Sequence, residues 1–452
     1  MASGGGPDYL DYRSPCQTFA LAISSGTSSS SKTSSPYPQS IAPFHSDLKL
    51  CVGSYIETAA SNNITVLGLN PQLLQDPEGF AYNNHREDDP SPSSSGGAGG
   101  DFVPLARADT PYPATKVDFS PSSLAGRLQN TTNTYETREM IASTSDSLRL
   151  WDLTGPSEGR GSSYVGRAGQ ASHSLVERSA LTNKPLSERP APLTSFDWST
   201  INPSYIVTSS IDTTCTVWDI STNAAVTQLI AHDKEVFDVV WSPASSKVFA
   251  SAGADGSVRS FDLRALETST ILYDHESASA SSGDSKRSGR GTPLLRLAFN
   301  PTDPNTLAVV HADNPSISIL DVRSPGLPLA ELHSHTAPVN GIAWCGSSVG
   351  SGNTNTSTNG YSNNGEYTDG SGAGNAMLAS ISDDHQVLLW DLMRPNPQGE
   401  AGGQRKPQPL PRPIGLPNAA YTAPRQLDSV AWGAGREYLA VTMGDTVRCL
   451  RV

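Results

Sequence analysis

Residues 227–264 read TQLIAHDKEVFDVVWSPASSKVFASAGADGSVRSFDLR, and this stretch decides the fold. Apolar and polar residues alternate in the run that ends at Trp241, as they do in a half-buried strand. A Ser/Pro-containing turn, a second apolar run and a Gly-containing turn follow, and the stretch closes on Phe261 and Asp262. Short strands separated by turns at even intervals indicate an all-β fold.

Two kinds of marker in this stretch recur along the chain. An aromatic residue ends an alternating run at Phe119, Trp198, Trp241, Phe299, Trp344 and Trp432. An aromatic residue or Leu precedes Asp at Trp151, Trp218, Phe261, Leu320 and Trp390. The first and second markers are 20 residues apart in the units that begin at Trp198 and Trp241, and 21 apart in the unit that begins at Phe299. Constant spacing indicates one repeated unit, and polar insertions explain the longer intervals of the remaining units.

This pattern is typical of WD repeats, each of which folds as one four-stranded blade of a β-propeller. The sequence therefore predicts an all-β fold, a single seven-bladed WD40 propeller over residues 8–452 with long disordered surface inserts. The seven units lie at about 16–69, 111–153, 192–221, 227–265, 271–323, 329–393 and 420–452. Low-complexity inserts lie at about 22–40, 76–108, 154–190, 276–291, 346–375 and 394–418. Without these inserts about 42 residues remain for each unit, a normal repeat length.

The seventh unit ends one strand short of a complete blade. Residues 9–13, near the other end of the chain, form a short segment that can supply the missing strand. Closing the ring in this way removes free sheet edges, which otherwise invite aggregation. We therefore expect the N- and C-terminal segments to share one blade.

Composition and charge narrow the classes of function. The formal net charge of -13 disfavours direct nucleic-acid binding, in which contacts to phosphate dominate affinity. The five cysteines show neither zinc-ligand nor disulfide spacing, so we predict no metal and no cofactor. The sequence shows no signal-peptide pattern and no membrane-spanning run, which favours a protein of the nucleus and cytoplasm. The propeller is expected to be monomeric.

Ser, His, Asp and Trp residues recur at fixed places in the units. His232 and His335 each lie nine residues before a first-strand Trp, and Asp residues lie six before the second marker. A catalytic triad would occur once, whereas buried polar groups that tie strands together recur in every blade. These positions resemble the structural hydrogen-bond tetrad of WD40 blades, and the resemblance assigns to it Thr208, Asp212, Trp218, His232, Ser251, Asp255, His335, Ser380, Asp384 and Trp390. A propeller enzyme that uses the same Ser, His and Asp residues is a remote alternative.

Several strings of sequence resemble one WD-repeat family in particular. They include PLTSFDW at 192–198, SSIDTTCTVWD at 209–219, PLLRLAFN at 293–300 and DDHQVLLWD at 383–391. The family is that of the plant transparent-testa-glabra regulator and the animal DDB-and-cullin-associated factor seven. The resemblance implies a scaffold without catalytic activity. It implies bridging of MYB and basic helix-loop-helix factors in plants, and binding of dual-specificity tyrosine-regulated kinases and homeodomain-interacting kinases in animals.

The same resemblance gives a second hypothesis, a substrate receptor of a cullin-four ubiquitin ligase. Asp262 and Arg264, and likewise Asp321 and Arg323, resemble the WDxR ending through which some propellers bind the cullin-four adaptor. In both places the Trp is replaced, and a solvated Arg at a blade edge is the alternative interpretation.

For the scaffold hypothesis, partners are expected to bind the upper rim and the mouth of the central channel, where loops from all blades converge. The candidate rim residues are Asp212, Thr213, Asp233, Lys234, Glu235, Asp383 and His385. Each of them can equally be a turn former or an exposed charge.

Overall fold

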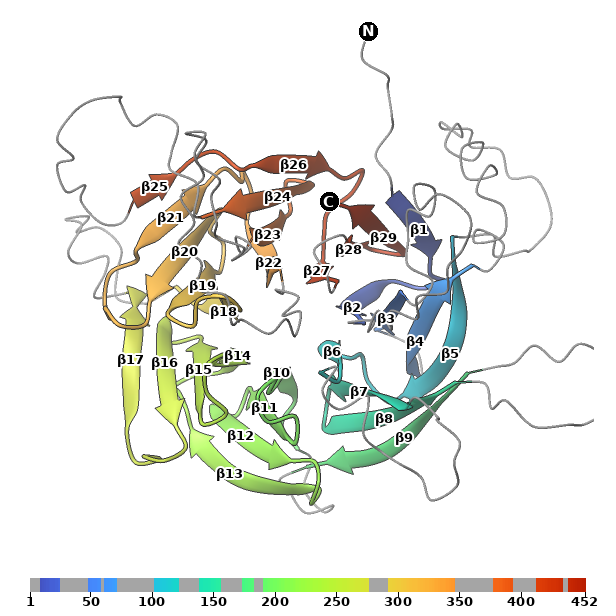
Figure 1. Ribbon diagram of the computed structural model, residues 1–452, viewed down its shortest axis with the longest axis horizontal. Coiled ribbons are helices and arrows are strands. Elements are labelled where there is room, and N and C mark those ends of the chain that lie inside the picture. Colours follow the sequence, from blue (N-terminus) through green and yellow to red (C-terminus); the bar gives the residue numbers. More distant parts are fainter. Residues whose placement is uncertain are drawn as a thin grey trace, which may run out of the picture.

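The fold is a seven-bladed β-propeller, as the repeats predict (Figure 1). The computed structural model describes residues 9–24, 48–57, 61–70, 101–121, 138–155, 173–182, 190–275, 292–345, 377–392, 412–433 and 438–452. These residues form 29 β-strands, which are arranged in seven sheets around a central axis. Most of the predicted inserts lie outside the described residues.

Each blade is numbered here by its order in the chain and is given from its inner to its outer strand. Blade 1 contains β2 (Thr18–Ile23), β3 (Lys49–Ser54), β4 (Asn62–Leu69) and β5 (Phe102–Thr110). Blade 2 contains β6 (Lys116–Phe119), β7 (Arg138–Thr144), β8 (Leu148–Thr154) and β9 (Ser174–Leu181). Blade 3 contains β10 (Leu193–Trp198), β11 (Tyr205–Ser210), β12 (Thr214–Asp219) and β13 (Ala224–Ile230). Blade 4 contains β14 (Val236–Trp241), β15 (Val248–Gly253), β16 (Ser257–Asp262) and β17 (Ser269–Asp274).

The remaining three blades are less regular in their outer strands. Blade 5 contains β18 (Leu294–Phe299), β19 (Thr306–His311), β20 (Ser316–Asp321), β21 (Ala330–His333) and a fifth strand, β25 (Arg412–Ile414). Blade 6 contains β22 (Val339–Trp344), β23 (Met377–Ser382), β24 (Gln386–Asp391) and β26 (Ala419–Thr422). Blade 7 contains β27 (Ser429–Trp432), β28 (Tyr438–Met443), β29 (Thr446–Arg451) and, at its outer edge, β1 (Tyr9–Arg13).

The blades differ from the sequence units in where they begin and end. Units predicted to start at 227, 271 and 329 take in residues of β13, β17 and β21, which are outer strands of the preceding blades. Strands β9 and β25, and all but the last two residues of β5, lie within stretches predicted to be inserts. An outer strand packs on one side only and needs few apolar residues, so its composition resembles that of an insert. In β13, for example, the burial pattern is almost entirely exposed.

Apolar side chains between adjacent blades form the core. Between blades 2 and 3, buried residues of β7 and β8 pack against Phe196, Trp198 and Trp218. Two of the tryptophans that end inner strands also bind across blades: Nε1 of Trp344 donates to the Ala298 carbonyl at 3.0 Å, and Nε1 of Trp432 donates to the Ala343 carbonyl at 3.0 Å. Trp198 instead donates to the Pro203 carbonyl of its own blade at 2.7 Å, so what these tryptophans share is their packing in the core between blades.

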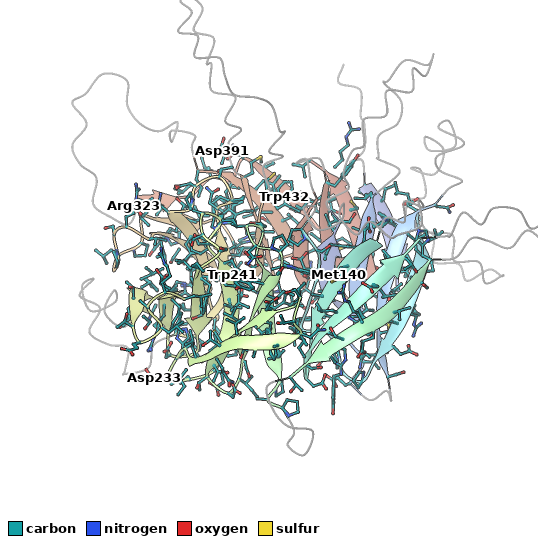
Figure 2. The ribbon with its side chains drawn as sticks, turned by 60° about the horizontal axis from the view of Figure 1, so that its bottom comes forward. Met140, Asp233, Trp241, Arg323, Asp391 and Trp432 are labelled. Atoms are coloured by element: carbon teal, nitrogen blue, oxygen red, sulfur yellow. The ribbon has the colours of Figure 1, made fainter. Side chains whose placement is uncertain are left out.

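The antiparallel order of the strands fixes two rims. The turns between the second and third strands of each blade lie on the same side as the connections from one blade to the next. We call this side the upper rim, and the opposite side, with the connections between third and fourth strands, the lower rim. Figure 2 shows Asp233 of the upper rim at the lower left of the view, Asp391 of the lower rim at the top and Arg323 of the lower rim at the upper left.

Candidate functional site

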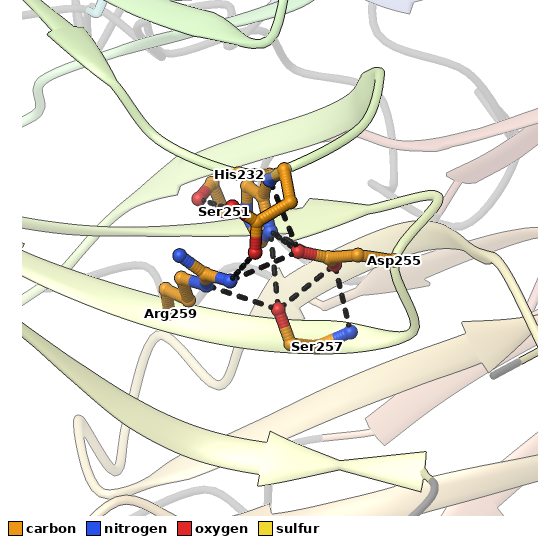
Figure 3. A network of polar contacts seen from close by, with 6 residues as sticks. His232, Ser251, Asp255, Ser257 and Arg259 are labelled. Carbon is orange, nitrogen blue, oxygen red and sulfur yellow. Dashed lines mark hydrogen bonds and ion pairs between the residues drawn. The ribbon is translucent and has the colours of Figure 1, made fainter.

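In blade 4 the predicted tetrad residues form one buried polar network (Figure 3). The imidazole of His232 has Nε2 2.7 Å from Ser251 Oγ and Nδ1 3.0 Å from each carboxylate oxygen of Asp255. Arg259 extends the network, because its guanidinium lies 3.1 Å from Asp255 and 2.9 Å from Asp233. Burial alone would raise the pKa of Asp255, but the hydrogen bonds it receives hold that pKa well below its ordinary value.

Blade 6 contains the complete four-residue chain. His335 Nδ1 lies 2.9 Å from Asp384, Nε2 lies 2.8 Å from Ser380 Oγ, and Trp390 Nε1 donates to the same oxygen at 2.9 Å. A carboxylate can only accept, so Nδ1 carries the proton, and the Ser380 hydroxyl then donates to Nε2. Burial lowers the pKa of His335, which favours this neutral imidazole.

The tetrad serine is not available to a substrate. Ser380 is fully buried, and the side chains of His335 and Asp384 are 1% and 5% exposed. Its oxygen already bonds both Trp390 and His335. A nucleophile must reach the reacting atom, so this arrangement serves the packing of the blade rather than acyl transfer.

Blade 3 keeps only part of the network. Trp218 Nε1 donates to Thr208 Oγ1 at 3.0 Å, but Asp212 bonds neither of these residues. Asp212 instead accepts from the backbone NH of Thr214 at 3.2 Å and from its hydroxyl at 2.6 Å, within its own turn. Asp212 thus receives hydrogen bonds near a tight turn, as the tetrad interpretation expects, but no described histidine links it to Thr208.

Blade 2 has a related pair that the sequence prediction missed. Trp151 Nε1 donates to Ser143 Oγ at 2.9 Å, and Asp146 in the adjacent turn accepts from Arg149 at 2.6 Å. Arg149 and Arg259 each lie two residues before the second marker, which was the signal that could have identified them. In both blades this arginine ties the turn to its third strand.

The candidate rim residues all lie on the upper rim. Asp233, Lys234 and Glu235 connect β13 to β14 and are exposed, and the side chain of Asp233 is 85% exposed although Arg259 holds it. Thr213 and His385 adopt left-handed backbone conformations, with φ of 73° and 67°, in the tight turns of blades 3 and 6. Thr213 and His385 are therefore turn residues, whereas Asp233, Lys234 and Glu235 are exposed at the surface where a partner can contact them.

Asp383 differs from the exposed trio. It is partly buried and accepts a hydrogen bond from Asn340 Nδ2 at 2.7 Å. The same amide nitrogen donates to the Leu427 carbonyl of the segment that leads into blade 7 at 2.9 Å. Asp383 therefore stabilises the contact between blades 6 and 7.

The two arginines considered for adaptor binding lie on the lower rim. Arg264 binds Asp262 at 2.6 Å and Arg323 binds Asp321 at 2.9 Å, and these guanidinium side chains are 71% and 69% exposed. Each pair is local, two residues apart, and ion pairs of this exposure stabilise a fold very little. Both arginines can exchange their partner aspartate for an external one at small cost.

A central channel of about 540 Å³ runs between the inner strands of all seven blades. Aspartates that are buried or partly buried line it, and sequence inspection did not single them out. Asp238 accepts from Ser195 Oγ at 2.6 Å and from the Leu297 backbone NH at 2.8 Å, which joins blades 3, 4 and 5. Asp197 accepts from the Trp241 backbone NH at 2.7 Å, which joins blades 3 and 4.

The channel aspartates predict a pH dependence of stability. Burial raises the pKa of Asp197 to about 7, with Lys116 opposing and Asp118 and Asp238 adding to the shift. From its ordinary pKa of 3.8 upward, the unfolded chain loses this proton while the folded protein keeps it, so stability falls as pH rises toward 7. The substitution Asp197→Asn removes the group that titrates. It should therefore raise the free energy of unfolding by about 1–2 kcal/mol at pH 8, with little gain at pH 4.

Thermal unfolding of Asp197→Asn and the parent protein at both pH values measures this difference. Asp233→Asn, at an exposed position, is the matched control and should leave stability unchanged at both. An equal offset at pH 4 and pH 8 would contradict the assignment, since it would show that the carboxylate does not titrate between them.

The described part of the chain was also searched for a metal site and for a membrane-spanning helix. Within it, no group of three or more His, Cys, Asp or Glu side chains is placed to hold a metal ion. His333 and His335, which lie two residues apart in the sequence, bind Glu331 and Asp384 respectively. None of the described segments is a helix long and apolar enough to cross a membrane.

Comparison with known proteins finds WD-repeat relatives. The family model for the WD domain, G-beta repeat, matches residues 224–262. The chain is 33% identical to a DDB1- and CUL4-associated factor 7 homolog of Dictyostelium discoideum over 405 residues, which are 89% of this chain and 91% of that protein. It is 38% identical over 301 residues to a WD repeat-containing protein of Schizosaccharomyces pombe, covering 64% of this chain and 57% of the relative. A WD repeat-containing protein of Saccharomyces cerevisiae is 39% identical over 308 residues, covering 66% and 51%.

Proposed function

Because this chain belongs to the WD-repeat family of the DDB1- and CUL4-associated factor 7 homolog, we propose that it is a non-catalytic scaffold that assembles other proteins on its upper rim. We propose that its partners are dual-specificity tyrosine-regulated kinases, or MYB and basic helix-loop-helix factors. We propose the nucleus and cytoplasm as its location, where such partners act.

One observation carries this proposal: the upper rim presents exposed charges on a rigid base. Asp233 is exposed, yet Arg259 holds it, and Arg259 is itself bound to Asp255 of the buried network. The Ala231 backbone NH donates to the Thr213 carbonyl at 2.9 Å, which ties the same connection to the neighbouring turn. A surface held in one conformation loses little entropy on binding, so it suits a scaffold.

The upper-rim proposal predicts a loss of captured partners in a charge-deletion variant. The tagged protein is purified from its native cells at moderate salt, and bound proteins are quantified by mass spectrometry. The triple variant Asp233→Ala, Lys234→Ala and Glu235→Ala should retain the fold and reduce recovery of the main partner about tenfold, because about 1.4 kcal/mol of lost contact is a factor of ten. Unchanged recovery with this variant would overturn the upper-rim assignment.

A second candidate function is a substrate receptor of a cullin-four ligase, favoured by the exposed Arg264 and Arg323 on the lower rim. The name of the Dictyostelium relative associates that protein with DDB1 and CUL4. The double variant Arg264→Ala and Arg323→Ala is the matched control in the purification above. Selective loss of a cullin-four adaptor with the double variant would favour the receptor function, and full retention of the adaptor would dismiss these residues.

A further inference from the structure

Blade 3 has a cavity close to its incomplete polar network. In blades 4 and 6, a buried imidazole lies against the Asp of the tight turn and the Ser of the second strand. In blade 3 the corresponding turn residue, Asp212, lines a cavity of about 30 Å³ between blades 2 and 3. Pro190 and Ala191, the described residues that lead into β10, line it without offering a donor side chain.

The cavity walls carry one negative charge that nothing described neutralises. Asp146 also lines the cavity, but Arg149 binds it at 2.6 Å. Asp212 forms no ion pair within the described segments, and only its Oδ1 atom receives hydrogen bonds there. A carboxylate at a small cavity attracts a cation, and the neutral polar groups around it, from Thr214 and Gln228, can accept further hydrogen bonds.

An exposed aliphatic surface borders the cavity. Ile230 pairs with Thr214 and Gln228 pairs with Thr216 between β12 and β13, so their side chains share the cavity face of the sheet. Ile230 is 81% exposed, and Val226, four residues before it in β13, is 50% exposed, so this strand presents apolar side chains to solvent.

The size of the cavity decides which cation fits. A volume of about 30 Å³ admits one or two water-sized groups, so it admits an ammonium group but not an imidazole ring. The aliphatic stem of a lysine would then lie over Ile230, since such stems bury readily against apolar surface. We propose that this cleft, lined by Asp146, Asp212, Thr214, Thr216 and Gln228 and bordered by Ile230, which pairs with Thr214, binds the lysine side chain of a partner protein.

This inference rests on the scaffold function, but it can be tested without any partner. The probe is Nα-acetyl-lysine N-methylamide, titrated into the full-length protein at fixed salt, with the norleucine analogue as its uncharged control. The readout is the indole N–H NMR signal of Trp218, which lines the cavity and is assigned with Trp218→Phe. A saturable shift is expected with the lysine probe only, and binding should weaken at least tenfold in Asp212→Asn.

Two variants at Gln228 keep the test valid if Asp212→Asn has a folding defect. Gln228 is exposed and donates to Thr214 Oγ1 at 3.1 Å, so its replacement leaves the core intact. Gln228→Lys places an ammonium of the chain itself in the cleft and should block the probe, whereas Gln228→Met removes one neutral acceptor and should weaken binding less than Asp212→Asn does. Equal binding to all four proteins, or no saturable shift with the parent protein, would overturn the proposal.

Two further outcomes distinguish the proposal from a cleft that the chain itself fills and from a scaffold that has no lysine site. Arg189 stands nine residues before Trp198, the place of the histidine in blades 4 and 6, and lies outside the described residues. If the probe binds only after Arg189→Gln, this chain fills its own cleft and the proposal is wrong. If partners are captured from cells while the titration shows no binding, the lysine site fails and the scaffold function stands.

Discussion

Replacement of Trp390 by alanine is expected to lower the free energy of unfolding by about 3–5 kcal/mol, the usual range for a buried Trp. The side chain is 1% exposed and packs in the apolar cluster between blades 5 and 6. It also donates to Ser380, which links it to His335. The substitution therefore leaves a cavity and removes one donor from a buried network, and both effects lower stability.

Urea unfolding followed by circular dichroism measures this loss, and Trp390→Phe provides the matched control. Phe261 holds the corresponding position in blade 4, where the aromatic ring has no polar atom to donate. The phenylalanine variant should therefore lose only about 1–2 kcal/mol, the value of one buried hydrogen bond and a small volume change. Equal losses for the two variants would contradict the packing account and assign the whole effect to the hydrogen bond.

The fold could be predicted from sequence because its inner strands are constrained on every side. Trp198, Trp241 and Trp344 each end a strand that packs against two neighbouring blades, so few residue types fit and the marker repeats. The outer strands lack this constraint. β9 and β25 are held by backbone pairing along one edge, and their sequences therefore read as insert.

The site was less predictable, because the tetrad positions are degenerate from blade to blade. His335, Ser380 and Asp384 follow the pattern completely, but blade 3 replaces the serine with Thr208 and uses Asp212 within its turn. The role of the channel residue Asp238 could not be predicted from the sequence, for another reason. Its partners, Ser195 and Leu297, belong to other blades and come together only when the ring forms.

One arginine, Arg448, makes several contacts at the junction of the two chain ends. Strand β1 pairs with β29 along five residues, from Tyr9 opposite Leu450 to Arg13 opposite Thr446 (Figure 1). Arg448 of β29 makes a two-point contact with the Asp11 carboxylate at 2.6 and 2.5 Å, and it also donates to the Tyr421 hydroxyl of blade 6. Its guanidinium stacks 3.9 Å from the centroid of the Tyr9 ring.

Arg448→Ala is therefore expected to detach β1 and to lower the free energy of unfolding by about 2–3 kcal/mol. The arginine side chain is 13% exposed and Asp11 is 36% exposed, so solvent screens the pair only in part. Loss of β1 would leave the edge of β29 unpaired, and hydrogen exchange at residues 446–451 should speed up before the rest of the ring unfolds. Arg13→Ala is the control: that side chain is 79% exposed, and its ion pair with Asp445 should contribute less than about 1 kcal/mol.

The extent of the faster hydrogen exchange shows how far the effect of β1 reaches. Since β1 completes the last blade, faster exchange confined to β29 would show that closure is local, whereas faster exchange in every blade would show that all seven blades depend on this one junction. Unchanged exchange in Arg448→Ala would mean that backbone pairing alone holds the ring closed.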